Sequence, residues 1–184
     1  MTSDAGSPDP EETARIEETL AAEVRRTIAA TLRNSSSAAA DTAKAVRDSI
    51  AASMTMAETM GATQLATMRG IAKGVMQGVG DAGGDAVGAA REVTSAFVKE
   101  AAERGADVAA AARRSLDGVL DGVNTDSTAE TLKSASAGVL ESAREFSGLA
   151  LNTMGEMFTA LADATRKAAE NLKAKEPPEG GTKV

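Results

Sequence analysis

The side chains that most often carry out catalysis are scarce in this chain of 184 residues, which contains no His, Cys, Tyr or Trp. Acid–base chemistry therefore falls to Asp, Glu and Lys, and no segment of the sequence concentrates them in one place. The absence of cysteine excludes disulfides, zinc–thiolate sites and thiol catalysis. We predict a protein that is not an enzyme and has no cofactor.

Two pairs of aspartates have a spacing that suits a cation. Asp81 and Asp85 are one helical turn apart, and so are Asp117 and Asp121. Two carboxylates on a helix lack the converging carbonyl oxygens of a calcium site. We interpret both pairs as solvated helix faces and predict no metal site.

Residues 78–83 match the G-x-G-x-x-G pattern of dinucleotide-binding loops. That loop functions only as the turn between a buried strand and a helix. Residues 60–77, which precede it here, have the pattern of a helix. The match therefore predicts no nucleotide site.

Charge and hydropathy exclude further classes of function. The net charge is −7 and the pI about 4.8, so there is no basic surface for nucleic acid. Residues 1–9 lack the basic segment and apolar run of a secretory signal, which predicts a cytoplasmic protein. The longest uncharged stretches, 59–68 and 146–155, have ten residues each. A membrane-spanning helix needs about 20, so we predict no transmembrane segment.

The positions of proline permit long helices, because all four prolines lie within the first ten and last eight residues. Asp9 or Ser7 can cap a first helix that starts at Pro10. Residues 127–130, Ser-Thr-Ala-Glu, form a capping box that predicts a second start after a turn at 122–127. A break at 34–37, where Asn and Ser compete for backbone hydrogen bonds, is left open.

The most informative feature is an internal repeat. Five arginines are each 22 residues apart: Arg25, Arg47, Arg69, Arg91 and Arg113. Between them, small and apolar residues step by four, four and three, which is an 11-residue period of 3.67 residues per turn. Such a stripe stays nearly straight on a helix, unlike the heptad stripe of a left-handed coiled coil. We expect the stripe to include Met54, Met76, Val98, Leu120, Phe146, Met154, Met157 and Leu161.

Glycine is concentrated in residues 70–88. Gly70, Gly74 and Gly78 are spaced by four, and so are Gly80, Gly84 and Gly88. The seven glycines of this segment would cost on the order of 6 kcal/mol in a helix relative to alanine. Either another helix packs closely against these small residues, or the segment is a hinge that becomes helical only when bound.

These patterns predict an all-α fold of long amphipathic helices with an 11- and 22-residue repeat, folded back as an elongated antiparallel helical hairpin or bundle. Residues 1–9 and 175–184 are expected to be disordered tails. Between them lie repeat helices over 10–123 and a C-terminal amphipathic helix over 127–174.

Proline-free, alanine-rich amphipathic repeats of this kind resemble the exchangeable apolipoproteins, the late-embryogenesis-abundant proteins and the phasins of storage granules. The resemblance covers about residues 13–174, and residues 142–173, followed by Pro177 and Pro178, look most like a phasin helix and its tail. It implies reversible binding to apolar interfaces and brings no catalytic residues with it.

Three functions remain open. The protein coats an apolar granule or lipid surface, with the stripe on the surface and the charged borders in water. Alternatively it forms a structural bundle or scaffold, alone or with other copies of itself. The third is a chain that becomes helical only on drying or crowding. The arginine row either binds anionic headgroups or forms a solubilising border beside the stripe.

Overall fold

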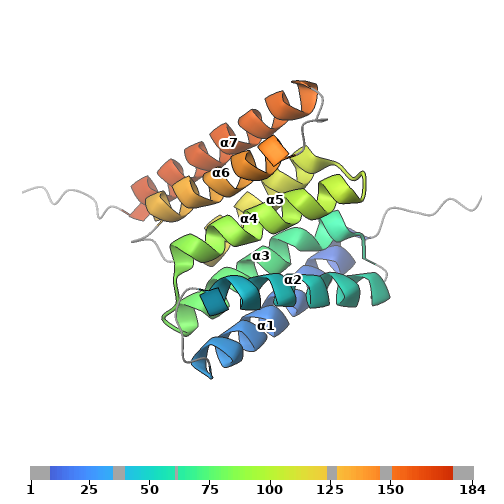
Figure 1. Cartoon of the computed structure of the whole chain (residues 1–184), viewed down its shortest axis with the longest axis vertical. Helices are drawn as coiled ribbons and strands as arrows, with labels where there is room; N and C mark the ends of the chain where they lie inside the picture. The colour runs from blue at the N-terminus through green and yellow to red at the C-terminus, as the bar shows by residue number, and fades with distance from the viewer. Residues whose placement is uncertain (1–8, 35–39, 61, 124–127, 146–150, 176–184) are drawn as a thin grey trace, which may run out of the picture.

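The computed structural model describes residues 9–34, 40–60, 62–123, 128–145 and 151–175. Within these residues the chain forms seven α-helices and no strand, and the helices pack into a bundle (Figure 1). The helices are α1 (Pro10–Arg33), α2 (Ala40–Thr59), α3 (Gln64–Asp81), α4 (Ala86–Glu103), α5 (Val108–Gly122), α6 (Thr128–Glu145) and α7 (Leu151–Lys175). The predicted all-α bundle is confirmed.

The helices follow one another from one end of the bundle to the other, from α1 to α7 (Figure 1). Extensive contacts join only helices that are one or two places apart in the chain. The odd-numbered helices pack side by side, α1 on α3, α3 on α5 and α5 on α7, and the even-numbered helices do the same. The described part of the protein is therefore a two-layered array, and each added helix extends one layer.

Three turns in the middle of the chain share one backbone hydrogen bond and are 22 residues apart. In each, an amide hydrogen-bonds back to the carbonyl five residues earlier: Ala62 to Ala57, Gly84 to Val79 and Ala106 to Ala101. This is the Schellman closure of a helix end. Gly83 and Gly105 adopt φ of 67° and 65°, a conformation that glycine reaches without a steric penalty.

The helix that follows each of these turns is capped at an equivalent position. Thr63, Asp85 and Asp107 accept hydrogen bonds from backbone amides of the first turns of α3, α4 and α5. One 22-residue unit is therefore one helix plus one turn. The repeat does not mark two successive stretches of a longer helix.

The predicted boundaries compare with these helices as follows. Asp9 caps α1, as one of the two predicted alternatives, because its carboxylate accepts from the amide of Glu11 at 3.0 Å. α1 ends at Arg33, next to the break left open at 34–37, of which 35–37 lie outside the described residues. α5 ends at Gly122, where a fold-back was expected over 122–127, and 124–127 are outside the described residues. Residues 127–174 contain two helices, α6 and α7, where we expected one.

A single hydrophobic core runs through all seven helices. Its largest fully buried side chains include Phe97 of α4, Leu20 and Ile28 of α1, and Met68 and Met76 of α3. Buried alanines fill much of the remainder. No helix in the described part is both long enough and apolar enough to span a membrane.

Candidate functional site

The first aspartate pair is divided between two structural contacts. Asp81 is the last residue of α3, and its carboxylate accepts from Arg25 of α1, Nε at 2.6 Å and Nη2 at 3.1 Å. This hydrogen bond holds the pKa of Asp81 below its ordinary value and raises the pKa of Arg25. Asp85 accepts from the amide of Gly88 at 2.9 Å. The two carboxylates therefore serve different partners.

The second pair does face a cation, which is a lysine. Lys167 of α7 places its Nζ 2.8 Å from Asp117 Oδ1 and 3.6 Å from Asp121 Oδ1. Both aspartates are about two-thirds buried or more, so the predicted solvated face is wrong at this position. In the described part of the chain, no group of three or more acidic side chains has a geometry that could hold a metal ion.

The G-x-G-x-x-G segment 78–83 lies at the end of α3 and in the turn that follows. A Cβ added at Gly78 would lie 2.7 Å from the carbonyl oxygen of Arg25, so this glycine is required for helix packing. Gly83 is the residue with positive φ in the turn. The match to the pattern thus arises because Gly78 is needed for helix packing and Gly83 for the turn after the helix.

The first glycine row lies against α1. A Cβ at Gly70 would overlap with the backbone of Glu17, and a Cβ at Gly74 would overlap with that of Ala21. Together with Gly78, these residues place the backbones of α3 and α1 in direct contact over two turns. Of the two alternatives for this segment, the geometry over 70–78 is that of close helix packing.

The second glycine row is not one face of one helix, because the turn between α3 and α4 interrupts it. Gly80 has no atom within 4 Å of an added Cβ. Gly84 lies in the turn near Val79 and Leu32, and Gly88 lies in the first turn of α4 against the capping Asp85. These three glycines do not form a packing surface together.

The described residues of the predicted apolar stripe lie inside the bundle or against its core. Met54, Met76, Val98 and Leu120 are buried, and each belongs to the core. Leu161 is half-buried against the core. Phe146 lies outside the described residues, as do the side chains of Met154 and Met157.

The five repeat arginines form a regular set of ion pairs. Each one pairs with a carboxylate on the helix two places later, and each guanidinium is about half exposed. The pairs are Arg25–Asp81 at 2.6 Å, Arg47–Glu92 at 2.7 Å, Arg69–Asp121 at 2.6 Å, Arg91–Glu141 at 2.5 Å and Arg113–Asp163 at 3.7 Å. Water and salt screen such exposed pairs, so they add little to stability. Their regular placement shows that each of these arginines lies against the next helix of its layer.

The carboxylate partners are the residues that sequence reasoning missed. Each stands three residues after a buried glycine or alanine: Gly78, Ala89, Gly118, Gly138 and Ala160. Residues three apart lie on the same side of a helix. A small residue lets the neighbouring helix approach, and the acid beside it then reaches the arginine. In three cases the sequence shows the signal directly, as Gly-Val-x-Asp or Gly-Val-x-Glu at 78, 118 and 138.

Backbone contact and ion pair occur at the same arginine. A Cβ at Gly118 would overlap with the carbonyl oxygen of Arg69, and a Cβ at Gly138 would overlap with that of Arg91. Gly78 bears the same relation to Arg25. Each of these arginines therefore contacts the next helix of its layer through both its main chain and its side chain.

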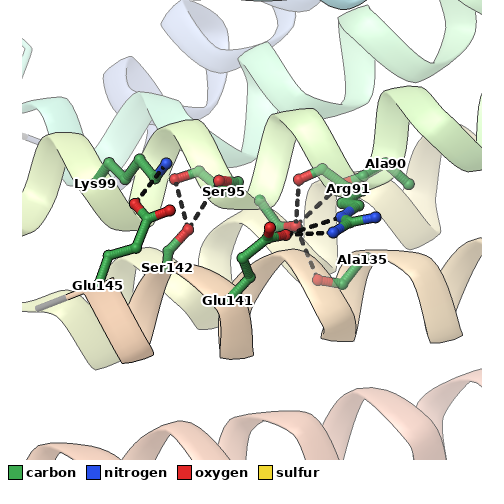
Figure 2. A network of polar contacts seen from close by, with 9 residues as sticks. Ala90, Arg91, Ser95, Lys99, Ala135, Glu141, Ser142 and Glu145 are labelled. Atoms are coloured by element: carbon green, nitrogen blue, oxygen red, sulfur yellow. Dashed lines mark hydrogen bonds and ion pairs between the residues drawn. The ribbon is translucent and has the colours of Figure 1, made fainter.

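The α4–α6 contact shows one such site in detail (Figure 2). Arg91 donates to Glu141 from Nε at 3.0 Å and from Nη2 at 2.5 Å. Two turns further along, Lys99 pairs with Glu145 at 2.7 Å. The two charged pairs border the contact on its exposed side.

Hydroxyl groups connect the same two helices between these charged pairs. Ser95 Oγ and Ser142 Oγ lie 2.8 Å apart (Figure 2). The buried Thr94 Oγ1 lies 2.8 Å from the carbonyl oxygen of Ala135 across the interface. These hydroxyls bond to each other and to main-chain oxygens, which is a packing role.

Charges also extend across the odd-numbered layer. Glu17 of α1 lies 3.5 Å from Arg114 of α5. Burial raises the pKa of Glu17, and the positive charges of Arg69 and Arg114 oppose that effect. Arg69 in turn pairs with Asp121, which Lys167 of α7 approaches. Four helices of one layer thus contribute to one row of alternating charges.

A groove of about 580 Å³ runs between α1 and α3. Its walls include Arg25 and Asp81, which are bonded to each other, together with Lys73 and Gln77. Four alanines of α1 also line it: Ala21, Ala22, Ala29 and Ala30. The groove is therefore the solvent-exposed edge of the α1–α3 contact, lined by an ion pair and by alanines.

Comparison of the chain with protein-family models, with curated proteins and with solved structures gives no match.

Proposed function

We propose that the protein is a non-catalytic scaffold, an array of helices that is folded before it meets a partner. The observation that supports this function best is the position of the stripe. Met54, Met76, Val98 and Leu120 are buried between helices. A protein that uses this stripe on a surface must first take these side chains out of the bundle.

The energetic cost of that step favours the scaffold. Full burial of one Val, Leu or Met side chain contributes about 1.5–3 kcal/mol. The four stripe residues lie in four different helices, α2 to α5, so their joint exposure requires the array to open along its length. The close glycine contacts between helices of the same layer would be lost in that opening.

Far-UV circular dichroism with a thermal melt tests this function. We expect strong helicity and a cooperative melt in dilute buffer, and no gain in helicity on lipid vesicles or hydrophobic polymer particles. Weak helicity in buffer that rises sharply on such a surface would contradict the scaffold and favour a surface-coating protein of the phasin kind. Weak helicity that rises only on drying or crowding would favour a conditionally folded protein.

One observation favours reversible binding to an apolar interface as a second function, confined to one end of the array. The side chain of Phe158 on α7 is 55 % exposed and is the most exposed large apolar side chain in the described residues. A partial opening at α7 would leave the core of α1 to α5 intact. This second function needs only one helix to be available to the surface.

A further inference from the structure

The attachment of α7 differs from that of the other helices. Among its described side chains, the buried ones are all alanines: Ala160, Ala164 and Ala168. Each of the other six helices buries at least one Val, Ile, Leu, Met or Phe. Alanine buries little area, and hydrophobic stabilisation scales with buried area. Over its described side chains, α7 therefore gains less from hydrophobic burial than each of the other helices.

The apolar surface of α7 is wider than the part that the bundle covers. At about 100° per residue, the arc from Phe158 through Leu161 to Ala160 spans about 160°. No charged residue between positions 154 and 172 falls within this arc, which exceeds the roughly 100° stripe typical of an amphipathic helix. The array covers the alanine side of the arc and leaves Phe158 exposed.

The net charge of α7 is opposite in sign to that of the whole chain. It carries four Lys and Arg against three Asp and Glu, a net charge of +1, as α3 also has, in a chain of −7. Lys167 and Asp163 tie it to α5, through Asp117 at 2.8 Å and through Arg113 at 3.7 Å. These groups are a third to a half exposed, so salt and competing anions weaken the pairs. A negatively charged surface would compete with Asp117 for Lys167.

We propose that α7 is a releasable surface-binding helix that leaves α5 and lies on an anionic lipid surface. In that state Phe158 and Leu161 enter the apolar layer, and Lys167, which lies next to Ala160 at the edge of the arc, faces the lipid headgroups, as in interfacial amphipathic helices. The inference goes beyond the scaffold and rests on the second function, reversible binding to an apolar interface.

A covalent lock provides the decisive test, and the chain suits it because it has no cysteine of its own. The double variant R113C/D163C, joined by a short bismaleimide, locks α7 to α5. The matched control R25C/D81C locks α1 to α3 at the equivalent ion pair. Both are mixed with vesicles of phosphatidylcholine and phosphatidylserine, and binding is measured by co-sedimentation before and after cross-linking.

We expect the α7 lock to reduce vesicle binding at least tenfold and the α1–α3 lock to leave it unchanged. Equal binding with and without the α7 lock would overturn the role of α7 while leaving reversible interface binding intact. If the unlocked protein binds no vesicle of any composition, the second function fails together with this inference. Equal binding to pure phosphatidylcholine vesicles would overturn the assignment to an anionic surface.

A point variant tests the same surface without a lock. Phe158→Ser should weaken binding to the anionic vesicles about tenfold, because a large apolar group no longer enters the lipid. The matched control is Met56→Ser, at a side chain of α2 that is 43 % exposed. Circular dichroism verifies that both variants are folded. Unchanged vesicle binding in Phe158→Ser would overturn the proposal.

Discussion

Two contacts in the odd-numbered layer use the same spacing of small residues with different results. On α3, Gly70, Gly74 and Gly78 are four residues apart and meet the backbone of α1. On α7, Ala160, Ala164 and Ala168 have the same spacing and are buried. Glycine lets two backbones touch, whereas each alanine Cβ keeps its helix further away. The spacing therefore predicts a packing face, and the residue type decides how close the contact is.

The comparison also shows what the close contact allows. Where α3 approaches α1, the larger side chains Leu20, Val24 and Ile28 of α1 are fully or almost fully buried. Where α7 meets the array, Phe158 stays exposed and Leu161 is half-buried. In a chain with three Phe and no Trp or Tyr, the approach of the backbones determines how completely the available side chains are buried.

The largest expected effect comes from filling the glycine contact. Gly74→Leu places a side chain where an added Cβ already overlaps with Ala21, so one helix must move away. We expect a loss of on the order of 3 kcal/mol or more in the free energy of unfolding, measured by chemical denaturation. The matched control is Gly80→Ala, which meets no atom within 4 Å and should raise stability by about 0.5–1 kcal/mol. Similar results for the two variants would remove the distinction between packing and exposed glycines.

Hydrogen exchange measures the contrast between the two contacts in the unaltered protein. The amides of α7 should exchange through openings with a free energy at least about 2 kcal/mol lower than those of α3, because α7 buries only alanines among its described side chains. Equal protection in both helices would show that the α5–α7 contact is as strong as the α1–α3 contact.

Acidity should act in opposite directions on two carboxylates of the α1–α3 contact. The pKa of Glu17 is raised by burial, so the folded state holds its proton more tightly than the unfolded state. As pH falls from 7 through the range just above 4.5, the wild type should gain stability relative to Glu17→Gln. The pKa of Asp81 is lowered, so below about pH 4 the wild type should lose stability relative to Asp81→Asn. Denaturation midpoints across this pH range measure both differences, and parallel curves would contradict the assignments.

The smallest expected effect distinguishes the ion pairs of the two contacts. Arg25 reaches Asp81 through two hydrogen bonds, whereas Arg113 and Asp163 are 3.7 Å apart. Asp81→Asn should therefore lower the melting temperature at neutral pH more than Asp163→Asn. High salt should reduce this difference because it screens both pairs. A larger shift for Asp163→Asn would mean that the ion pair matters more where the helix contact is weaker.

The sequence was sufficient for the fold class and for the first helix cap. Proline at the ends, abundant alanine and the acidic first turn all predict helices, and Asp9 caps α1 as one of the two candidates. The individual helices could not be predicted from the stripe alone. Twenty-two residues are about six helical turns. The apolar stripe therefore has the same spacing whether one long helix runs through the units or a new helix begins in each unit. The signal that would have revealed the helix ends is a glycine followed two residues later by a capping aspartate. It occurs at Gly83 and again 22 residues later at Gly105.

The partners of the arginines depend on a contact that local sequence does not specify. Gly-Val-x-Asp at 78 and 118 indicates a small packing residue with an acid beside it, but not which helix it meets. Only the two-layered arrangement brings Asp81 to Arg25 and Asp121 to Arg69. The sequence also could not show that α7 buries its alanines while Phe158 remains outside.

The pairing of each arginine with the helix two places later affects how the chain acquires its structure as the ribosome makes it. The five arginine pairs join residues that are 45 to 56 positions apart. Each helix can therefore reach its neighbour in the layer once the next two helices have left the exit tunnel. The array can grow one unit at a time from α1 onward, and α7 is the last of the described helices to dock.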